Sequence, residues 1–368
     1  MTSSPRFAAL PNAVTDARGV LHFGSLVESR ALAAGALVER SDRVVVRITG
    51  SDRLRWLDSI SSQSLTGLDA GASAESLILD PNGHVEFVLH VLAQPESLLL
   101  TVDRARADAA LSWLSRMVFR LDVHLAIEAD WTVFAVTAAE LPERISNFVT
   151  EQQVPVWVDP WPDVVAGGFG YAAHVSDWQC RELLCGPEAA EVLVDLVRRG
   201  ELAAAGLLAF DAARIAAGRP DATDLDEKSL PHEFDWLRTA VHLNKGCYRG
   251  QETVAKVFNL GRPPRRMVRL HLDGSDSLLP VPGDELWAEK IIGDQREPRL
   301  IGHVTAAARH EELGPIALAL IKRAVPDEVR AWVLHEGSEV AASIEGIVPA
   351  DAGPQIEIPR LPRMGIRR

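Results

Sequence analysis

The segment from residue 43 to residue 129 carries strand-like and helix-like patterns in an order that few folds accommodate. In chain order the strand-like runs are 43–48, 76–80, 84–92, 97–102 and 122–129, and the helix-like runs are 52–60 and 103–119. Pro81, Asn82 and Gly83 lie between two of these strands and favour a tight hairpin turn. The order strand, helix, hairpin, strand, helix, strand predicts one compact split β-α-β unit over residues 42–128.

The chain after residue 129 mixes helices with strands, and beyond residue 262 it changes to short strand-like runs. Helices are predicted at 187–200 and 207–220, because Gly200 and the Gly218–Pro220 pair are typical stop signals. The later runs are 267–272, 300–307, 316–321, 329–334 and 339–344, and turns rich in Gly and Pro separate them. Many short strands of this kind favour a small β-barrel or sandwich, with a domain boundary near residue 262.

The composition of the 368-residue chain limits the classes of function. A formal net charge of -13 argues against general nucleic-acid binding, because duplex affinity depends on many Lys and Arg contacts to phosphates. Three cysteines are too few for a disulfide scaffold and fit a reducing compartment. No apolar run approaches the roughly 18 residues of a membrane span, and the N-terminal segment lacks the pattern of a signal peptide. We expect a soluble, cytoplasmic and monomeric protein that does not insert in a membrane.

The octapeptide "KGCYRGQE", residues 245–252, gathers residues that are rare elsewhere in the chain. It holds one of three cysteines and one of five lysines. If residues 244–248 are extended, the side chains of Lys245 and Cys247 point the same way. The ammonium group and the N-terminus of a helix beginning near Gly250 would both favour thiolate over thiol. The alternative is a plain strand-to-helix corner in which Cys247 is a small buried side chain.

The octapeptide resembles the signature of the YgfZ family, the folate-binding relatives of the aminomethyltransferase (T-protein) of the glycine cleavage system. That family typically reads Lys-Gly-Cys-Tyr-x-Gly-Gln-Glu, and every fixed position is present here. Three further segments resemble family segments in the expected order: "LDPNGHV" (79–85), "ARIAAGRP" (213–220) and "LPHE" (230–233). The resemblance covers most of residues 40–310, and the octapeptide is its most specific part.

The resemblance implies an α+β protein with the three-domain, ring-like T-protein fold around a folate-sized channel. It implies a discontinuous folate-binding domain (1–41 plus 129–261), a ferredoxin-like domain (42–128) and a C-terminal small β-barrel domain (262–368). The implied cofactor is tetrahydrofolate. The implied role is support of iron–sulfur cluster assembly or repair and of iron–sulfur-dependent tRNA modification, with iron–sulfur client or assembly proteins as partners.

The resemblance also implies the site residues. Lys245 and Cys247 would carry the activity beside the folate channel. The residues expected to contact folate or shape its site are Tyr248, Gly250, Gln251, Glu252 and Arg214.

Departures from the T-protein pattern bear on the reaction. The T-protein's Arg-x-Glu-x-Gly is here Arg214-Ile-Ala216-Ala-Gly218, and its Lys-x-Asp is Lys245-Gly-Cys247. The T-protein has acidic residues after its early hairpin, and in the matching region of this chain Glu86 is the only one. Aminomethyl transfer needs a carboxylate near the reacting folate nitrogen, so enzymatic activity stays open. The alternatives to an iron–sulfur accessory protein are a tetrahydrofolate-dependent aminomethyl or one-carbon transferase and a non-catalytic docking scaffold.

Other candidate sites have weaker patterns. Cys180 and Cys185 are separated by four residues on a predicted strand, roughly 16 Å along it, which is too far to share a metal. The glycine-rich run 167–173 lacks the final glycine of a dinucleotide loop, and the chain has no His-Glu-x-x-His motif and no phosphate-binding GKS or GKT. We therefore expect structural roles for these two thiols and no metal site.

Overall fold

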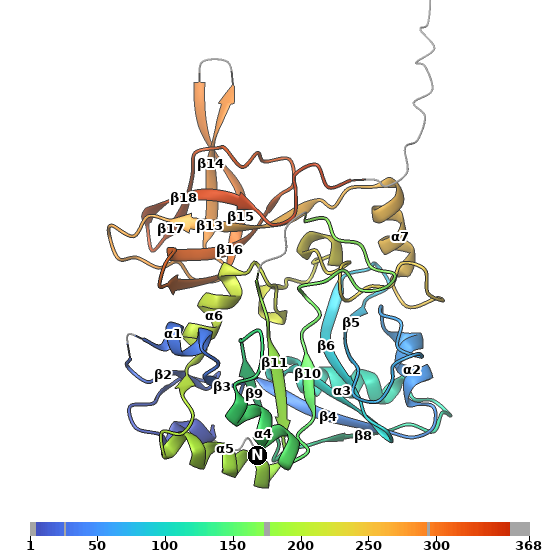
Figure 1. The fold of residues 1–368 in the computed structure, drawn as a ribbon. Helices are drawn as coiled ribbons and strands as arrows, with labels where there is room; N and C mark the ends of the chain where they lie inside the picture. The colour runs from blue at the N-terminus through green and yellow to red at the C-terminus, as the bar shows by residue number, and fades with distance from the viewer. Residues whose placement is uncertain (1–4, 26, 173–176, 293–294, 354–368) are drawn as a thin grey trace, which may run out of the picture.

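The computed structural model describes residues 5–25, 27–172, 177–292 and 295–353. They form three main sheets and the helices that cover them. Figure 1 shows a barrel at the top and two sheet-containing parts below it, side by side. A two-stranded ribbon, β1 (Val14–Thr15) with β2 (Val20–His22), lies near the first helices.

The lower right part contains a five-stranded antiparallel sheet in the order β5-β6-β7-β4-β8. Its elements are β4 (Arg43–Thr49), α2 (Arg53–Ile60), β5 (Ser73–Leu79), β6 (Val85–Ala93), β7 (Ser97–Asp103), η2 (Arg104–Arg106), α3 (Ala107–Arg116) and β8 (His124–Ile127). Trp56 and Leu57 of α2 and Leu114 of α3 pack against one face of this sheet. The β-α-β-β-α-β order, with β5 added at the edge, confirms the predicted ferredoxin-like unit.

The lower left part is built on a second five-stranded sheet in the order β10-β11-β9-β3-β12. Its strands are β3 (Leu37–Glu39), β9 (Thr132–Val136), β10 (Val156–Val158), β11 (Arg181–Cys185) and β12 (Ala204–Ala205). The accompanying helices are η1 (Arg6–Ala9), α1 (Glu28–Ala33), α4 (Glu143–Glu151), α5 (Pro187–Arg198) and α6 (Leu207–Ala216). Because β3 pairs with β9, the N-terminal segment joins a sheet whose other strands follow the ferredoxin-like unit in the chain.

Beyond residue 262 the chain forms the closed six-stranded barrel that the strand pattern predicts. The strands follow the order β13-β16-β15-β14-β17-β18 around the barrel. Their bounds are β13 (Arg265–Leu272), β14 (Glu285–Ile292), β15 (Gln295–His310), β16 (Gly314–Lys322), β17 (Ala331–His335) and β18 (Ser338–Gly346). Val268, Val304 and Val333 belong to the buried cluster of apolar side chains that fills the barrel. The short helices η3 (Ala222–Asp224) and η4 (Pro231–Phe234) and helix α7 (Gln251–Leu260) connect α6 to the barrel.

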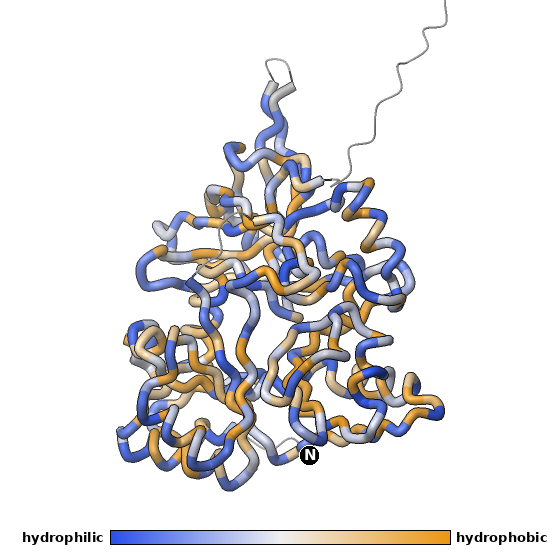
Figure 2. The backbone as a smooth tube through the Cα atoms, turned by 45° about the vertical axis from the view of Figure 1, so that its right-hand side comes forward, coloured by the Kyte–Doolittle hydropathy of each residue, from blue (hydrophilic) through white to orange (hydrophobic). Residues whose placement is uncertain are grey.

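The largest buried apolar cluster lies where the three parts meet. It joins Leu77 and Val88 of the ferredoxin-like sheet, Phe234 and Trp236 of the connecting segment, and Leu318 of the barrel. Figure 2 shows polar and apolar residues interleaved along the chain, as expected for elements that bury one face each. Among the described helices, none is both long enough and apolar enough to span a membrane.

Candidate functional site

The octapeptide forms a loop followed by a helix, and the loop is not extended as the sequence predicted. Residues 243–244 and 249–250 are turns and residues 245–246 are a bend, so alternation along a strand does not apply. Helix α7 begins at Gln251, directly after Gly250, where the sequence placed its start. The reason for the difference is the set of tertiary contacts made by Lys245 and Arg249, which curl the loop between two other segments.

Lys245 anchors the loop to the C-terminal end of helix α2. Its Nζ donates hydrogen bonds to the backbone oxygens of Asp58 (2.6 Å), Ser61 (3.0 Å) and Gln63 (2.7 Å). The Asp58 carboxylate lies 3.3 Å away, and the side chain of Lys245 is 4% exposed. A cation at this position satisfies carbonyls that a helix end leaves unpaired and complements the helix dipole. Burial lowers the pKa of Lys245, and Asp58 opposes this shift.

The ammonium group of Lys245 therefore has three carbonyl partners for its three protons. Among the described contacts, none joins it to the thiol of Cys247. Activation of the thiol by Lys245 stays a prediction. The role of Lys245 in positioning the loop rests on the three hydrogen bonds to backbone oxygens.

Tyr248 and Arg249 hold the other side of the loop. Tyr248 is buried, its ring centre lies 5.6 Å from Lys245 Nζ, and burial raises the pKa of its hydroxyl. Arg249 pairs with Glu86 of β6 at 2.7 Å, and its guanidinium group lies 5.7 Å from the ring of Trp113 on α3. The loop is thus clamped between the hairpin and helices of the ferredoxin-like unit.

Two glycines allow the loop to meet the β5–β6 hairpin backbone to backbone. Gly250 has φ +82°, and a Cβ there would lie 2.6 Å from the oxygen of Asp80 and 3.0 Å from Cα of Gly83. Gly83 has φ +84°, and a Cβ there would lie 2.9 Å from Cβ of Thr253. The segments "LDPNGHV" and "KGCYRGQE", far apart in sequence, are therefore parts of one packed unit.

Cys247 is exposed at the turn of this clamped loop, and its neighbour Gly246 faces open space. Cys180 and Cys185 are buried, and burial raises the pKa of both, that of Cys185 to about 12. The alternative of Cys247 as a buried structural side chain is therefore wrong. Among the described residues, no group of three or more His, Cys, Asp or Glu side chains is arranged to hold a metal ion.

The other predicted site residues lie in different surroundings. Gln251 Nε2 donates to the backbone oxygen of Lys245 at 3.3 Å, and Glu252 is exposed in the first turn of α7. Arg214 is 4% exposed and pairs with Asp224 at 2.7 Å. Arg214 thus belongs to a buried network at the centre of the molecule, away from the octapeptide.

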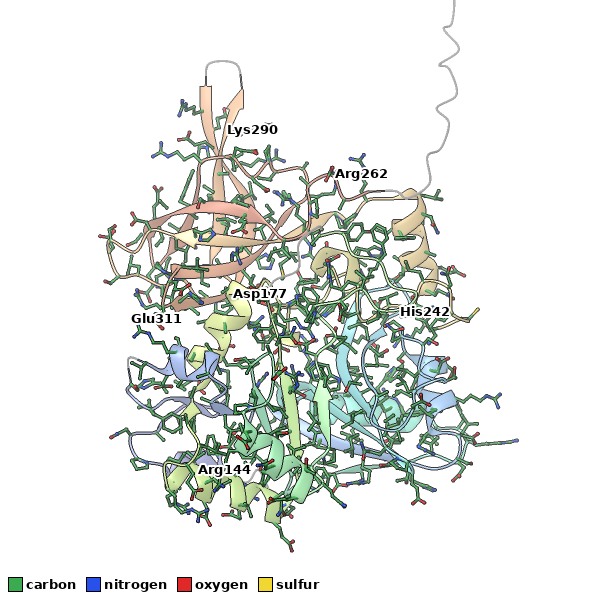
Figure 3. The ribbon with its side chains drawn as sticks, viewed as in Figure 1. Arg144, Asp177, His242, Arg262, Lys290 and Glu311 are labelled. Carbon is green, nitrogen blue, oxygen red and sulfur yellow. The ribbon has the colours of Figure 1, made fainter. Side chains whose placement is uncertain are left out.

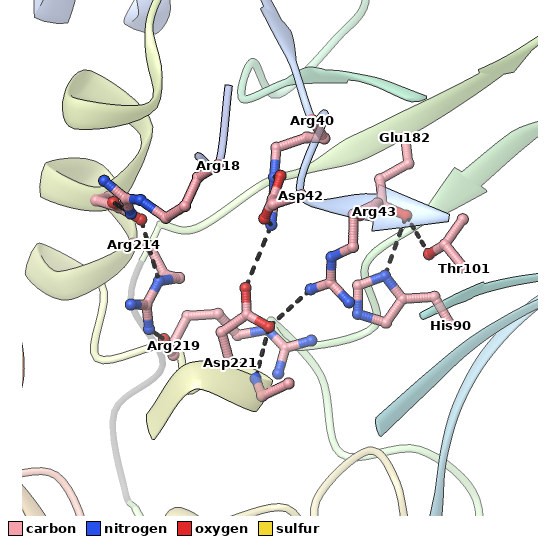
Figure 4. A network of polar contacts seen from close by, with 12 residues as sticks. Arg18, Arg40, Asp42, Arg43, His90, Thr101, Glu182, Arg214, Arg219 and Asp221 are labelled. Atoms are coloured by element: carbon pink, nitrogen blue, oxygen red, sulfur yellow. Dashed lines mark hydrogen bonds and ion pairs between the residues drawn. The ribbon is translucent and has the colours of Figure 1, made fainter. Parts of the chain in front are cut away.

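This network joins charged groups from the two lower parts of the molecule, and Figure 4 shows its core. Asp221 pairs with Arg43 at 2.7 Å and with Arg40 at 3.3 Å. Glu182 of β11 accepts a hydrogen bond from Thr101 of β7 at 2.8 Å. Such buried ions are tolerated because each has a partner of opposite charge or a hydrogen bond.

Two neighbours extend the network. Arg219 pairs with Glu75 of β5 at 2.7 Å and with Asp159 at 3.0 Å. Thr305 of the barrel donates to Asp224 at 2.7 Å. The cavity that remains in the network measures only about 20 Å³, and Arg214 is one of its lining residues. This space is too small for a folate, so the folate channel that the resemblance implies does not pass through this network.

A cavity of folate size lies instead between α1, α6 and the β15–β16 turn, with a volume of about 450 Å³. One face of α6 contributes a row of alanines to its wall: Ala209, Ala212, Ala213, Ala216 and Ala217. Trp178 forms another wall, and its Nε1 donates to Asp159 at 2.8 Å, which fixes the indole. Asp177, labelled in Figure 3 below the barrel, and Gln179 add a carboxylate and an amide.

Sequence reasoning missed the partners that position the octapeptide. Asp58 and Trp113 are ordinary helix residues that no local pattern marks, and Glu86 stands out in the sequence only as a counterpart of a T-protein acidic residue, not as a partner of Arg249. The one available signal was the "LDPNGHV" hairpin, because its glycine requires a positive φ and permits close packing. The partners of Lys245 lie more than 180 residues away in sequence.

We compared the sequence with families and proteins that are already known. No family model matches the chain. It is 26% identical over 262 residues to the tRNA-modifying protein YgfZ of Yersinia pseudotuberculosis serotype O:1b, covering 68% of this chain and 74% of that protein. It is 24% identical over 241 residues to a chloroplastic protein of Arabidopsis thaliana that carries a provisional transferase name, covering 62% of this chain. The match spans about half of the Arabidopsis protein, 54% of its length.

Among solved structures, the fold matches the glycine cleavage system aminomethyltransferase T of Bartonella henselae. The TM-score is 0.71 at 16% identity, over 96% of this chain and 99% of that chain. The fold is thus that of a T-protein, as predicted, with a thiol-bearing loop between helix α2 and the β5–β6 hairpin. The Yersinia matches and this fold together support assignment of the chain to the YgfZ family.

Proposed function

We propose that the protein is a folate-binding accessory factor for iron–sulfur-dependent tRNA modification, and that Cys247 is its reacting group. The observation that carries the proposal is an exposed thiol on a loop fixed from both sides by Lys245 and Arg249. The name of the Yersinia relatives supports the connection to tRNA modification. A thiol in such a position can act as a nucleophile or as a ligand for a soft metal.

The cavity beside α6 supports the folate-binding part of the proposal. Its volume of about 450 Å³ lies in the usual range of small-molecule sites. The fixed indole of Trp178 offers a flat wall, and Asp177 and Gln179 would hold the amino and oxo groups of the pterin edge. Tetrahydrofolate bound there would supply one-carbon chemistry. The lining of this cavity includes no octapeptide residue, so the thiol and the folate are separate parts of the proposed site.

The same geometry favours an accessory role over aminomethyl transfer. Ala216 lines the cavity at the position where the T-protein pattern has a glutamate. Glu86, the one acidic residue after the hairpin, is paired with Arg249. Neither position offers a free carboxylate for the proton transfers of a transferase.

We also propose the division into residues 1–41 plus 129–261, 42–128 and 262–368 as three domains. The pairing of β3 with β9 around the inserted ferredoxin-like sheet supports the discontinuous first domain. The closed barrel, which starts with β13 at Arg265, supports the last boundary. The three free cysteines fit a cytoplasmic setting.

Cys247→Ser is expected to abolish complementation of a bacterium that lacks its own YgfZ-family gene. The substitution replaces one sulfur atom at an exposed position, so it should leave the fold intact while removing the reacting group. The measurement is the activity of an iron–sulfur-dependent tRNA-modifying enzyme in the complemented strain. Asn244→Ala, at an exposed position of the same loop, is the matched control and should restore activity like the parent. Full activity with Cys247→Ser would refute the role of the thiol.

A further inference from the structure

A groove of about 730 Å³ lies on the outer wall of the C-terminal barrel, beside an arm formed by the far ends of β14 and β15. The arm projects above the barrel in Figure 1, and Lys290 marks it in Figure 3. Glu289, Arg296 and Pro298 line the groove from the arm, and Trp332 lines it from β17. The groove is a separate site, since none of its lining residues belongs to the octapeptide or to the α6 cavity.

Two arginines are held side by side at this groove by one carboxylate. Nη1 of Arg296 and Nη1 of Arg330 each lie 3.1 Å from a different oxygen of Glu289. The arginine side chains are 66% and 76% exposed, whereas Glu289 is 21% exposed. Among the described contacts, none engages the remaining N–H groups of these two side chains. The trio therefore keeps a net positive charge and presents free, oriented donors to the groove.

Trp332 supplies a flat apolar wall next to these donors. Its chain neighbours Ala331 and Val333 point into the barrel, so Trp332 lies on the outer wall. Its register partners are Trp287 on β14 and Ala341 on β18. Trp332 is half-buried and lines the groove beside the small side chain of Ala341, so part of the indole faces the groove.

We propose that this groove binds a nucleotide, with the base stacked on Trp332 and the phosphate held by Arg296 and Arg330. Guanidinium groups match phosphate oxygens in paired hydrogen bonds, and aromatic side chains stack bases of any sequence. Asp273 and Glu339 also line the groove and confine its positive charge to the two arginines, so the groove itself suits one phosphate group. The nucleotide is either free or a single residue of an unpaired RNA strand. The inference stands independently of the proposed function.

The test is calorimetric titration of the full chain with AMP, with adenosine and with an unstructured oligoadenylate of about eight nucleotides. AMP is expected to bind at least about tenfold more tightly than adenosine, because adenosine lacks the phosphate. An oligonucleotide affinity well above that of AMP identifies RNA as the source, and equal affinities identify a free nucleotide. The absence of binding by both phosphate-bearing ligands would overturn the proposal.

Substitutions of groove residues test whether the nucleotide binds in this groove. The double variant Arg296→Gln/Arg330→Gln, at exposed positions, and Trp332→Leu should each weaken binding at least about tenfold. Arg299→Gln is the matched control, since Arg299 is exposed on the same strand as Arg296 but does not line the groove. It should leave affinity unchanged. Affinity that survives the double arginine variant, or that falls equally with Arg299→Gln, would contradict the assignment.

Discussion

Replacing Lys245 with methionine is expected to lower the free energy of unfolding by about 3 kcal/mol, because hydrogen bonds to charged groups are among the stronger ones. The buried ammonium satisfies three backbone oxygens at the end of α2, at 2.6, 3.0 and 2.7 Å. Methionine keeps most of the side-chain volume but removes every donor, which leaves those carbonyls without their partner. The measurement is urea unfolding followed by circular dichroism.

Lys256→Met is the matched control for this prediction. Lys256 lies on α7, close to Lys245 in sequence, and is exposed. Its replacement should change stability by less than about 0.5 kcal/mol, as for most surface substitutions. If Lys245→Met costs no more than Lys256→Met, the anchoring role of Lys245 is wrong.

Gly250→Ala is expected to cost about 3 kcal/mol, the sum of left-handed backbone strain and overpacking. The backbone of Gly250 has φ +82°, and the added Cβ would meet the oxygen of Asp80 at 2.6 Å. It would also lie 3.0 Å from Cα of Gly83. These two atoms belong to the backbone of the β5–β6 hairpin, so neither can move as a flexible side chain would. Thermal unfolding of the purified variant measures the loss.

The octapeptide supplies its own control in Gly246→Ala. A Cβ at Gly246 meets nothing within 4 Å. Alanine there should change stability by less than about 1 kcal/mol in either direction, since a loop position without contacts responds mainly through chain entropy. Equal losses for the two glycine variants would show that the loop does not pack on the hairpin as described.

The elements set by local patterns were predictable from the sequence. The hairpin at Pro81–Gly83 follows from turn chemistry, and the start of α7 follows from Gly250 and the acidic first turn. The barrel follows from short strands between Gly- and Pro-rich turns. In each case the determining residues are neighbours in the chain, so the pattern is visible without the fold.

Features set by distant partners were not predictable. The curled loop depends on the carbonyls at the end of α2, and the filled centre depends on Arg219 meeting Asp159 and Glu75. No local rule states that an arginine will pair with carboxylates from two segments that are distant in sequence. The position of the buried network was therefore not visible in the sequence, while the resemblance carried by the octapeptide identified the fold itself.

The most direct test of the account is alkylation of the native protein with iodoacetamide, followed by mass spectrometry of its three cysteine peptides. We expect rapid labelling of Cys247, which is exposed, and protection of Cys180 and Cys185, which are 4% and 0% exposed. Protection of Cys247 to the same degree as the two buried thiols would contradict the claim that the clamped loop presents a reactive sulfur to solvent.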